Sequence, residues 1–415
     1  MKKRNLILLV IGISLLFSIL VTLQLNWSRQ IVKSLYYGEA KYLTSAIKQL
    51  FHNDETEASE NLELKINPDD LKVLSRHRDR AYLNNFISAS EKEYVPVIIN
   101  DTTYGKIRLK GNLNDHRIKN EWSYKVNLQK NHFVFGCEEF CLLKPERRGF
   151  VSEYFMHKIM KHLGFIGLHY NFINLILNDA PARVYAIEEG FTDVLLTKNG
   201  KSIAPIIKFD DDKYLEALKR DKIKISPANV KIVCLNKKGK SEADILEAKT
   251  LLSDFCFHKK SASEVFNIEK LGLYFAVMDL LGNTHSIIWK NQRFYFEKTT
   301  KRLEPIAYDG NEHDNIQSTL YGHWQRKKYP LASHDWINNF FQDPLFLQAY
   351  FNGLKKLSSP QYLEVFLNKN TSDFQTLTRV ARTDKRNYLF YDYKYIVNRD
   401  FIASFLLKTD INKRN

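Results

Sequence analysis

The chain has 415 residues, of which 44% are hydrophobic and 26% are charged. This mixture is too apolar for a disordered chain, and 16 Gly with 10 Pro exclude a collagen-like or low-complexity sequence. Lys and Arg outnumber Asp and Glu by 62 to 47, and the net charge of +15 suits an anionic partner without choosing among phosphate, nucleic acid and lipid. Nucleic acid is not expected, because no aromatic RNA-binding signature occurs.

An apolar segment opens the chain. Basic residues at positions 2–4 precede an uncharged run over residues 6–23, long enough to cross a bilayer as a helix. We predict a membrane anchor at residues 6–26, within a first unit of residues 1–28, with the N-terminus in the cytoplasm and the main domain periplasmic or extracellular. A cleaved signal peptide is the alternative, although residues 20–28 (LVTLQLNWS) contain no small-x-small site.

A polar stalk is predicted at residues 29–60, and residues 61–415 are expected to form one domain without internal repeats. Alternating apolar residues indicate strands, and a period near 3.6 indicates helices. Strands are predicted at 95–100, 106–109, 123–128, 172–177 and 184–187, helices at 150–163, 212–220, 242–257 and 268–281, and a hairpin from 293–296 and 303–307. Most of the remaining C-terminal sequence is helical in pattern. The expected fold class is α+β, with a sheet-rich N-terminal part and a helical C-terminal part.

Four cysteines are too few for a disulfide-rich framework, and their spacing fits neither a C-x-x-C pair nor a zinc site. Cys137 and Cys141 could pair outside the cytoplasm, whereas Cys234 and Cys256 are equally compatible with buried free thiols. The disulfide state of all four is open at this stage.

Four short motifs carry a family resemblance. Residues 108–112 (RLKGN) resemble the RLRGNS turn of the CotH family of spore-coat-protein-H kinases, and residues 123–126 (SYKV) resemble its KSYRI strand. Residues 185–189 (YAIEE) and 304–309 (EPIAYD) resemble two further strand ends of that family. The resemblance implies an atypical protein-kinase-like fold that phosphorylates Ser and Thr with ATP and Mg²⁺ or Mn²⁺.

The same resemblance suggests which residues bind the nucleotide. Lys125 lies in mid-strand, where a cation would contact the α- and β-phosphates, and Glu153 in the following helix is a candidate ion partner. Lys110 and Asn112 flank Gly111 in a turn that lets the backbone approach a phosphate. Each residue also has a purely structural explanation. Lys125 could be a solvated strand lysine, Glu153 could simply suit the helix dipole, and residues 110–112 could form an ordinary tight turn.

Acidic and amide residues at two further strand ends complete the predicted site. Glu188 and Glu189 should face opposite sides of their strand, and the spacing from the preceding tyrosine favours Glu189 as the one in the nucleotide cleft. Asp309 precedes a glycine and is expected to bind the metal, with Asn291 as the second metal ligand. Turn formation explains both of these residues equally well.

One position departs from the family pattern. Residues 282–285 (GNTH) resemble the family's NxD motif, in which the Asp orients the acceptor hydroxyl, but His285 stands at the Asp position. Histidine can accept a proton near neutral pH, yet it cannot bridge two cations as a carboxylate does. Asp279 precedes it on an apolar helix, where it could be either a substitute for the missing Asp or a buried structural acid.

Two functions therefore remain open, and His285 separates them. The first is a membrane-anchored, extracytoplasmic kinase that uses His285 and Asp309 to transfer phosphate from ATP to Ser or Thr of an envelope or coat protein. The second is a non-catalytic envelope or surface protein that retains the cleft for binding.

Overall fold

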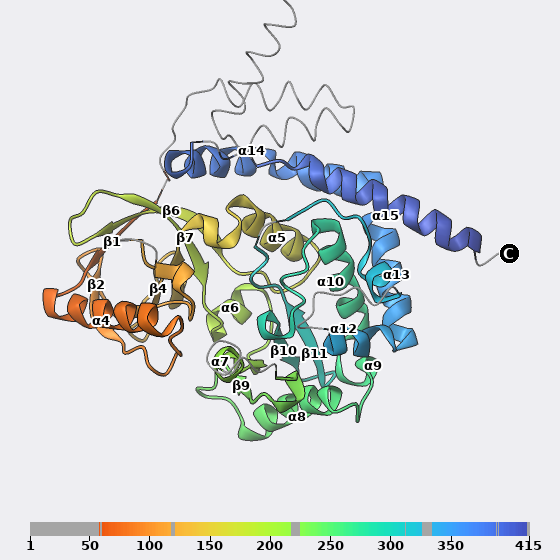
Figure 1. Cartoon of the computed structure of the whole chain (residues 1–415), viewed down its shortest axis with the longest axis horizontal. Helices are drawn as coiled ribbons and strands as arrows, with labels where there is room; N and C mark the ends of the chain where they lie inside the picture. Colours follow the sequence, from red (N-terminus) through yellow and green to blue (C-terminus); the bar gives the residue numbers. More distant parts are fainter. Residues whose placement is uncertain are drawn as a thin grey trace, which may run out of the picture.

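The computed structural model describes residues 58, 60–117, 121–216, 225–311, 313–325, 334–386, 388 and 390–412. Over these residues a sheet-rich N-terminal part precedes a helical C-terminal part (Figure 1), which confirms the mixed α+β class. No helix within these ranges is long and apolar enough to cross a membrane. The anchor predicted at residues 6–26, and nearly all of the predicted stalk, lie outside the described residues.

The N-terminal lobe is a closed barrel, and its strand order in the described chain is β1-β2-β3-β4-β5-β7-β6. Neighbouring strands are antiparallel except β1 and β6, whose parallel pairing closes the barrel. The strands are β1 (Asn61–Lys65), β2 (Val95–Ile99), β3 (Thr103–Leu109), β4 (Tyr124–Leu128), β5 (Glu139–Leu143), β6 (Tyr170–Leu177) and β7 (Arg183–Glu189).

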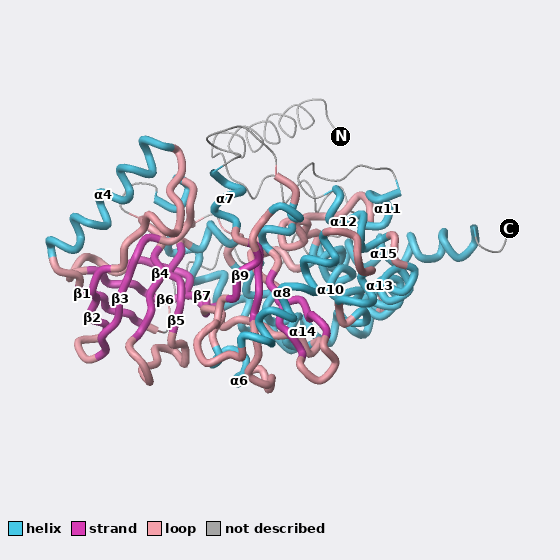
Figure 2. Tube along the Cα trace, turned by 90° about the horizontal axis from the view of Figure 1, so that it is seen from below, coloured by secondary structure: helices cyan, strands magenta, loops and turns pink. Residues whose placement is uncertain are grey.

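Alternate residues of these strands fill the barrel. Leu62 and Leu64 of β1, for example, are fully buried in the same cluster as Ile107 and Leu109 of β3. Because strand side chains alternate between faces, this pattern requires an interior that every strand shares. Helix α4 (Pro68–Asn84) packs on β2 and β3 at one end of the barrel (Figure 2).

The second lobe contains a four-stranded antiparallel sheet in the order β11-β10-β8-β9. Its strands are β8 (Ile206–Phe209), β9 (Ile232–Cys234), β10 (Arg293–Glu297) and β11 (Arg302–Ile306), and the predicted hairpin is its β10–β11 pair. Short helices α6 (Asp193–Lys198), α7 (Asp211–Glu216) and α9 (Ala262–Val265) and the longer α8 (Glu242–Cys256) lie in the segments between and around these strands.

Helix α5 (Val151–His162) lies between the barrel and the helical part (Figure 1), and it contacts both β6 and α14. It follows a short 3₁₀ helix, η2 (Pro145–Arg148). Gly164, just beyond its end, has a φ of +80°, the left-handed conformation in which glycine commonly ends a helix.

The helical part is built around α10 (Ile268–Leu281), which after its charged first turn is apolar except for Asp279 and almost wholly buried. Its closest partner is α13 (Pro344–Leu357), because Gly272 of α10 allows a very close approach: a Cβ atom there would lie 2.5 Å from the backbone nitrogen of Tyr350. The remaining helices are α11 (Leu320–Gln325), α12 (His334–Phe341), α14 (Pro360–Asp384) and α15 (Tyr393–Asn412), whose C-terminal end projects beyond the rest of the molecule in Figure 1.

Candidate functional site

A cleft of about 590 Å³ opens between the barrel and the second lobe. Its walls come from the turn after β3, from β4, β5 and the end of β7 on one side, and from β8, β10 and the segments after α10 and β11 on the other. Eight of the residues predicted from the sequence line it: Lys110, Asn112, Lys125, Glu188, Glu189, His285, Asn291 and Asp309. The fold thus brings together side chains that are up to about 200 positions apart in the chain.

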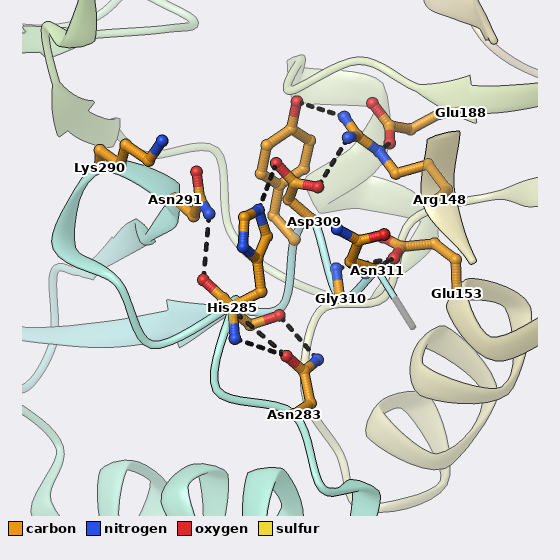
Figure 3. A network of polar contacts seen from close by, with 12 residues as sticks. Arg148, Glu153, Glu188, Asn283, His285, Lys290, Asn291, Asp309, Gly310 and Asn311 are labelled. Carbon is orange, nitrogen blue, oxygen red and sulfur yellow. Dashed lines mark hydrogen bonds and ion pairs between the residues drawn. The ribbon is translucent and has the colours of Figure 1, made fainter. Parts of the chain in front are cut away.

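Asp309 lies at the floor of this cleft, directly after β11, with a φ of +57°. Arg148 donates from Nη1 to its Oδ1 at 2.6 Å, and His285 Nε2 lies 3.5 Å from its Oδ2. Figure 3 shows the guanidinium and the imidazole approaching the carboxylate from different sides. Burial alone would raise the pKa of Asp309, but Arg148 and His285 lower it well below its ordinary value. Asp309 therefore remains a carboxylate.

Arg148, which ends η2, is the central cation of the site. Its Nε donates to Glu188 at 2.7 Å and its Nη2 to the Tyr308 hydroxyl at 3.0 Å, while only 5% of its side chain is exposed. Burial opposes its charge, yet Asp309 and Glu188 raise its pKa well above the ordinary value. Arg148 was not identified from the sequence. The charged segment PERR is typical of a solvent-exposed turn, and nothing in it shows that its last side chain is buried in the cleft.

Of the two adjacent glutamates, Glu188 is the one that joins this network. Glu189, which the spacing favoured, instead pairs with Lys198 at 2.9 Å and accepts from the backbone N–H of His169 at 2.8 Å. Both line the cleft and both are buried, but they point to different partners because side chains alternate along β7.

Three cationic side chains lie around the ring of Tyr308. The charged groups of Arg293, Arg148 and Lys110 lie 4.4, 5.1 and 5.8 Å from the ring centroid, and Lys110 also donates to the hydroxyl at 3.1 Å. Cation–π contacts of this kind strengthen as the groups lose water, and Tyr308 is 6% exposed. Like Arg148, Arg293 was not identified from the sequence, since an arginine at the start of a strand is ordinarily solvated.

Lys125 pairs with Glu139 on the neighbouring strand at 2.8 Å, and not with Glu153. The expected partner is displaced because Glu153 is fully buried beneath the Asp309 segment, where it accepts from the backbone N–H of Gly310 at 2.7 Å and of Asn311 at 3.3 Å. The assignment of Glu153 as the ion partner of Lys125 is therefore corrected: this carboxylate positions a loop.

The loop after Asp309 requires a glycine at position 310, where its backbone contacts Glu153. A Cβ atom on Gly310 would lie 2.7 Å from Met156 Sδ and 3.0 Å from Glu153 Oε2. His157 supports the carboxylate from the other side, with Nε2 3.3 Å from Glu153 Oε1. Helix α5 thus fixes the backbone beside Asp309 through one buried acid.

The turn that carries Lys110 and Asn112 is tightly held. Gly111 has a φ of +77°, and a Cβ atom there would lie 2.2 Å from the His116 ring, so this position requires glycine. Lys92 donates to Gly111 O and to Asn112 Oδ1, both at 2.7 Å, and burial lowers its pKa to about 6. Asn112 in turn donates to Asp212 Oδ1 at 2.8 Å, a contact between the two lobes. The asparagine therefore serves to hold the turn.

Two asparagines set the position of His285. The side-chain oxygen of Asn283 accepts from the His285 backbone N–H at 2.9 Å, and Asn291 Nδ2 donates to the His285 carbonyl at 3.0 Å (Figure 3). The imidazole consequently faces the cleft with 36% of its side chain exposed. Its Nε2 is directed at Asp309, which leaves Nδ1 for a ligand.

The side chains around Asp309 do not fit a divalent metal. Mg²⁺ requires oxygen ligands in near-ideal octahedral geometry, usually one or two carboxylates together with substrate phosphates. Here both carboxylate oxygens already face protein groups, Arg148 Nη1 on one side and His285 Nε2 on the other. Within the described ranges, no group of three or more His, Cys, Asp or Glu could hold a metal ion. Asp309 in this arrangement offers no open carboxylate oxygen to a metal, and the metal-binding role of Asn291 stays a prediction.

Within the described residues the cysteines take part in no metal site, although Cys141 lines the cleft. Cys137, Cys141, Cys234 and Cys256 are all free, and the first two are buried at separate positions on the barrel. The pairing left open by the sequence is not formed.

The fold and the site together define a mixed α+β protein with a charged cleft between a barrel and a helix-backed sheet. The chain belongs to the CotH family: the family model described as "CotH kinase protein" matches residues 107–399. That segment runs from β3 into α15 and contains all residues of the cleft except Ala89 and Lys92. A kinase-like family suggests ATP and a divalent metal in general. None of the curated proteins matches the chain.

Proposed function

We propose that the cleft binds ATP and transfers its terminal phosphoryl group to a hydroxyl acceptor, a Ser or Thr of an envelope or coat protein. The observation that supports this most directly is the His285–Asp309 pair at the edge of a cleft whose interior contains several cations. Phosphoryl transfer needs such an arrangement, because catalysis consists mainly of positioning and of charge stabilisation.

His285 is the proposed general base. Asp309 accepts from the Nε2–H group, so that the lone pair of Nδ1 faces the cleft and can take the proton of the acceptor hydroxyl. The carboxylate then stabilises the imidazolium that forms, as in other carboxylate–histidine pairs. A distance of 3.5 Å is long for a hydrogen bond, but such contacts often shorten when substrate binds.

The lysines on the barrel side are the proposed phosphate contacts. Lys125 lies on β4 and Lys110 at the turn after β3, and these strands are neighbours in the barrel. Their positive charges would offset the charge on the transferring phosphate oxygens. In this step the acceptor oxygen bonds to the γ-phosphorus of ATP, the bond to the bridging oxygen breaks, ADP leaves, and the hydroxyl proton passes to His285.

We also propose that the cleft lies outside the cytoplasm, behind an anchor at residues 6–26. Basic residues before an uncharged span favour a cytoplasmic N-terminus. A reporter enzyme fused after Asn415 should then be active only outside the cytoplasmic membrane. Activity of a cytoplasm-specific reporter at that position, or release of the protein without detergent, contradicts the topology.

A non-catalytic binding protein is the second candidate, and one observation favours it: the family's base carboxylate is replaced, and Asp309 is engaged by Arg148. Incubation of the full-length protein in detergent with γ-labelled ATP and an envelope fraction separates the two. Transfer of label by the parent protein supports the kinase. If the parent binds ATP without transfer while His285→Asp transfers, the natural protein is a binding protein. His132→Ala, in an exposed loop outside the cleft, is the matched control.

A further inference from the structure

The floor of the cleft contains more positive than negative charge, on side chains that are buried or half-buried. Lys110, Arg148 and Arg293 surround Tyr308, and the acids in contact with this group are Glu188 and Asp309, both bound to Arg148. Three cations against two carboxylates leave one positive charge without a counter-ion.

Arg293 is the cation that lacks an acidic partner. It is 6% exposed, and its Nη1 donates only to the backbone carbonyls of Lys290 and Gln292, at 2.8 and 3.0 Å. Its Nε is buried and has no hydrogen-bond partner, and no carboxylate in the described ranges lies within ion-pair distance of it. A buried charge is unfavourable unless it is paired, so the missing partner is expected to be an anion that enters the cleft.

Arg148, which lies on the same tyrosine ring as Arg293, also offers hydrogen-bond donors to an anion. A guanidinium has five N–H donors, and Glu188, Asp309 and Tyr308 each take one, which leaves two for ligand oxygens. Arginine binds phosphate through such paired donors. Arg148 also neutralises Asp309 at the position where a divalent metal would otherwise offset the negative charges of ligand and carboxylate.

We propose that Lys110, Arg148 and Arg293 form a preassembled polyphosphate site that needs no divalent metal, with Arg148 taking the place of the metal at Asp309. The occupant is the triphosphate of a nucleotide, in the cleft that the proposed function assigns to ATP, and the inference rests on that assignment. A volume of about 590 Å³ accommodates such a ligand. Phosphate binding by this chain is therefore metal-independent, in contrast to what a kinase-like family suggests in general.

Isothermal titration calorimetry on the full-length protein in detergent tests this inference. ATP and inorganic tripolyphosphate are each titrated in excess EDTA and in Mg²⁺. We expect both to bind in EDTA, with dissociation constants within about threefold of those in Mg²⁺. In EDTA, Arg293→Gln should weaken tripolyphosphate binding roughly 10-fold or more, and Arg293→Lys should retain most of the affinity.

The matched control is Arg399→Gln, which changes another buried arginine, on α15, that is paired with Glu364 and Asp400 outside the cleft. It should bind both ligands like the parent. Should Arg293→Gln fail to fold, as judged by circular dichroism, the comparison of EDTA with Mg²⁺ on the parent protein still decides the question.

The outcomes separate this inference from the proposed function. If ATP binds in Mg²⁺ but roughly 10-fold or more weakly in EDTA, the inference is wrong and the nucleotide cleft stands. If tripolyphosphate binds in EDTA and depends on Arg293, while ATP binds in neither buffer, the anion site stands and the proposed function is wrong. If neither ligand binds in either buffer, both are wrong.

Discussion

Two aspartates in different regions, Asp309 half-buried and Asp279 buried, show how the surroundings decide what an acid does. Asp309 lies at the cleft floor between Arg148 and His285, and these groups lower its pKa well below the ordinary value. Asp279 lies inside the helical part, on α10, where its carboxylate accepts from the Tyr350 hydroxyl and from the Leu320 backbone N–H. Burial raises the pKa of Asp279 to about 7, and its two hydrogen bonds offset this effect only in part.

The contrast shows that the cleft stabilises the ionised form of an acid, whereas the interior of the helical part stabilises the neutral form. The interface of α10 and α13 is apolar and tightly packed at Gly272, and Asp279 ties these helices to the start of α11 through hydrogen bonds. Asp279 is absent from the cleft lining in the described structure, so it is a structural acid and does not replace the family's base carboxylate. Of these two acids, Asp309 is the one whose ionised form is stabilised by a neighbouring cation, the buried Arg148.

The largest expected effect concerns His285 in the cleft. If the protein transfers phosphate, His285→Ala should lower kcat by about 10²–10⁴-fold, equivalent to roughly 3–5 kcal/mol, because the proton acceptor is lost. His285→Asp should retain or raise the rate, since a carboxylate restores the family pattern. Single-turnover transfer of labelled phosphate measures both, with His132→Ala as control. An unchanged rate in His285→Ala shows that the base lies elsewhere.

The helical region should respond to pH through Asp279. Its folded pKa is about 7 against an ordinary value of 3.8, so between these pH values the folded state holds a proton that the unfolded state has released. Stability should therefore fall as pH rises from about 4 to 7 and then level off, by at most about 4 kcal/mol at 1.36 kcal/mol per pKa unit. Asp279→Asn should remove this decline.

Urea unfolding of the parent, Asp279→Asn and Asp400→Asn at pH 5 and pH 8 tests this. Asp400 is an exposed acid on α15. Its variant should therefore keep the pH dependence of the parent. If Asp279→Asn keeps the full decline as well, the carboxyl is already ionised in the folded state, and the contrast with Asp309 disappears.

Gly310→Ala should damage the cleft by packing alone. The new Cβ atom would press on Met156 and Glu153, and overpacking of this kind costs about 1–3 kcal/mol. Since Glu153 holds the backbone beside Asp309, the rate of phosphate transfer should fall together with stability. Unfolding midpoints and transfer rates measured on the same sample report the two effects. Parent-like values of both indicate that the segment is free to shift and that Glu153 does not position it.

The smallest effect on stability is expected for Lys125→Met. The Lys125–Glu139 pair is partly exposed, at 24% and 23%, and such pairs contribute about 0–1 kcal/mol. ATP affinity should nevertheless fall by roughly 10-fold, because a charge-assisted contact to phosphate is lost. Lys158→Met, which breaks a more exposed pair with Asp373 on the helical side, should change stability as little and leave ATP binding intact. Equal ATP affinities in the two variants remove Lys125 from the nucleotide site.

Local pattern was enough to predict most of the secondary structure. Helix α10 matches the predicted residues 268–281 at both ends, because an apolar run between Asn267, whose side chain accepts from the Lys270 backbone N–H, and Gly282 in the left-handed conformation defines its limits locally. The β4 strand and the β10–β11 hairpin were likewise predicted to within one or two residues. Barrel closure was not predicted, since it depends on the parallel pairing of β1 with β6. These two strands are more than 100 positions apart in the chain.

By itself, the sequence determined the α+β class, the family resemblance and most of the residue types that line the cleft. The order of the motifs carries the family resemblance, because residues that must meet at one site recur in a constant order along related chains. Only the tertiary structure decided which groups actually meet: Glu188 with Arg148, Lys125 with Glu139, and Glu153 with Gly310. It also revealed Arg148 and Arg293 as buried cations. Burial and charge pairing depend on neighbours brought together from distant segments, and no local pattern records them.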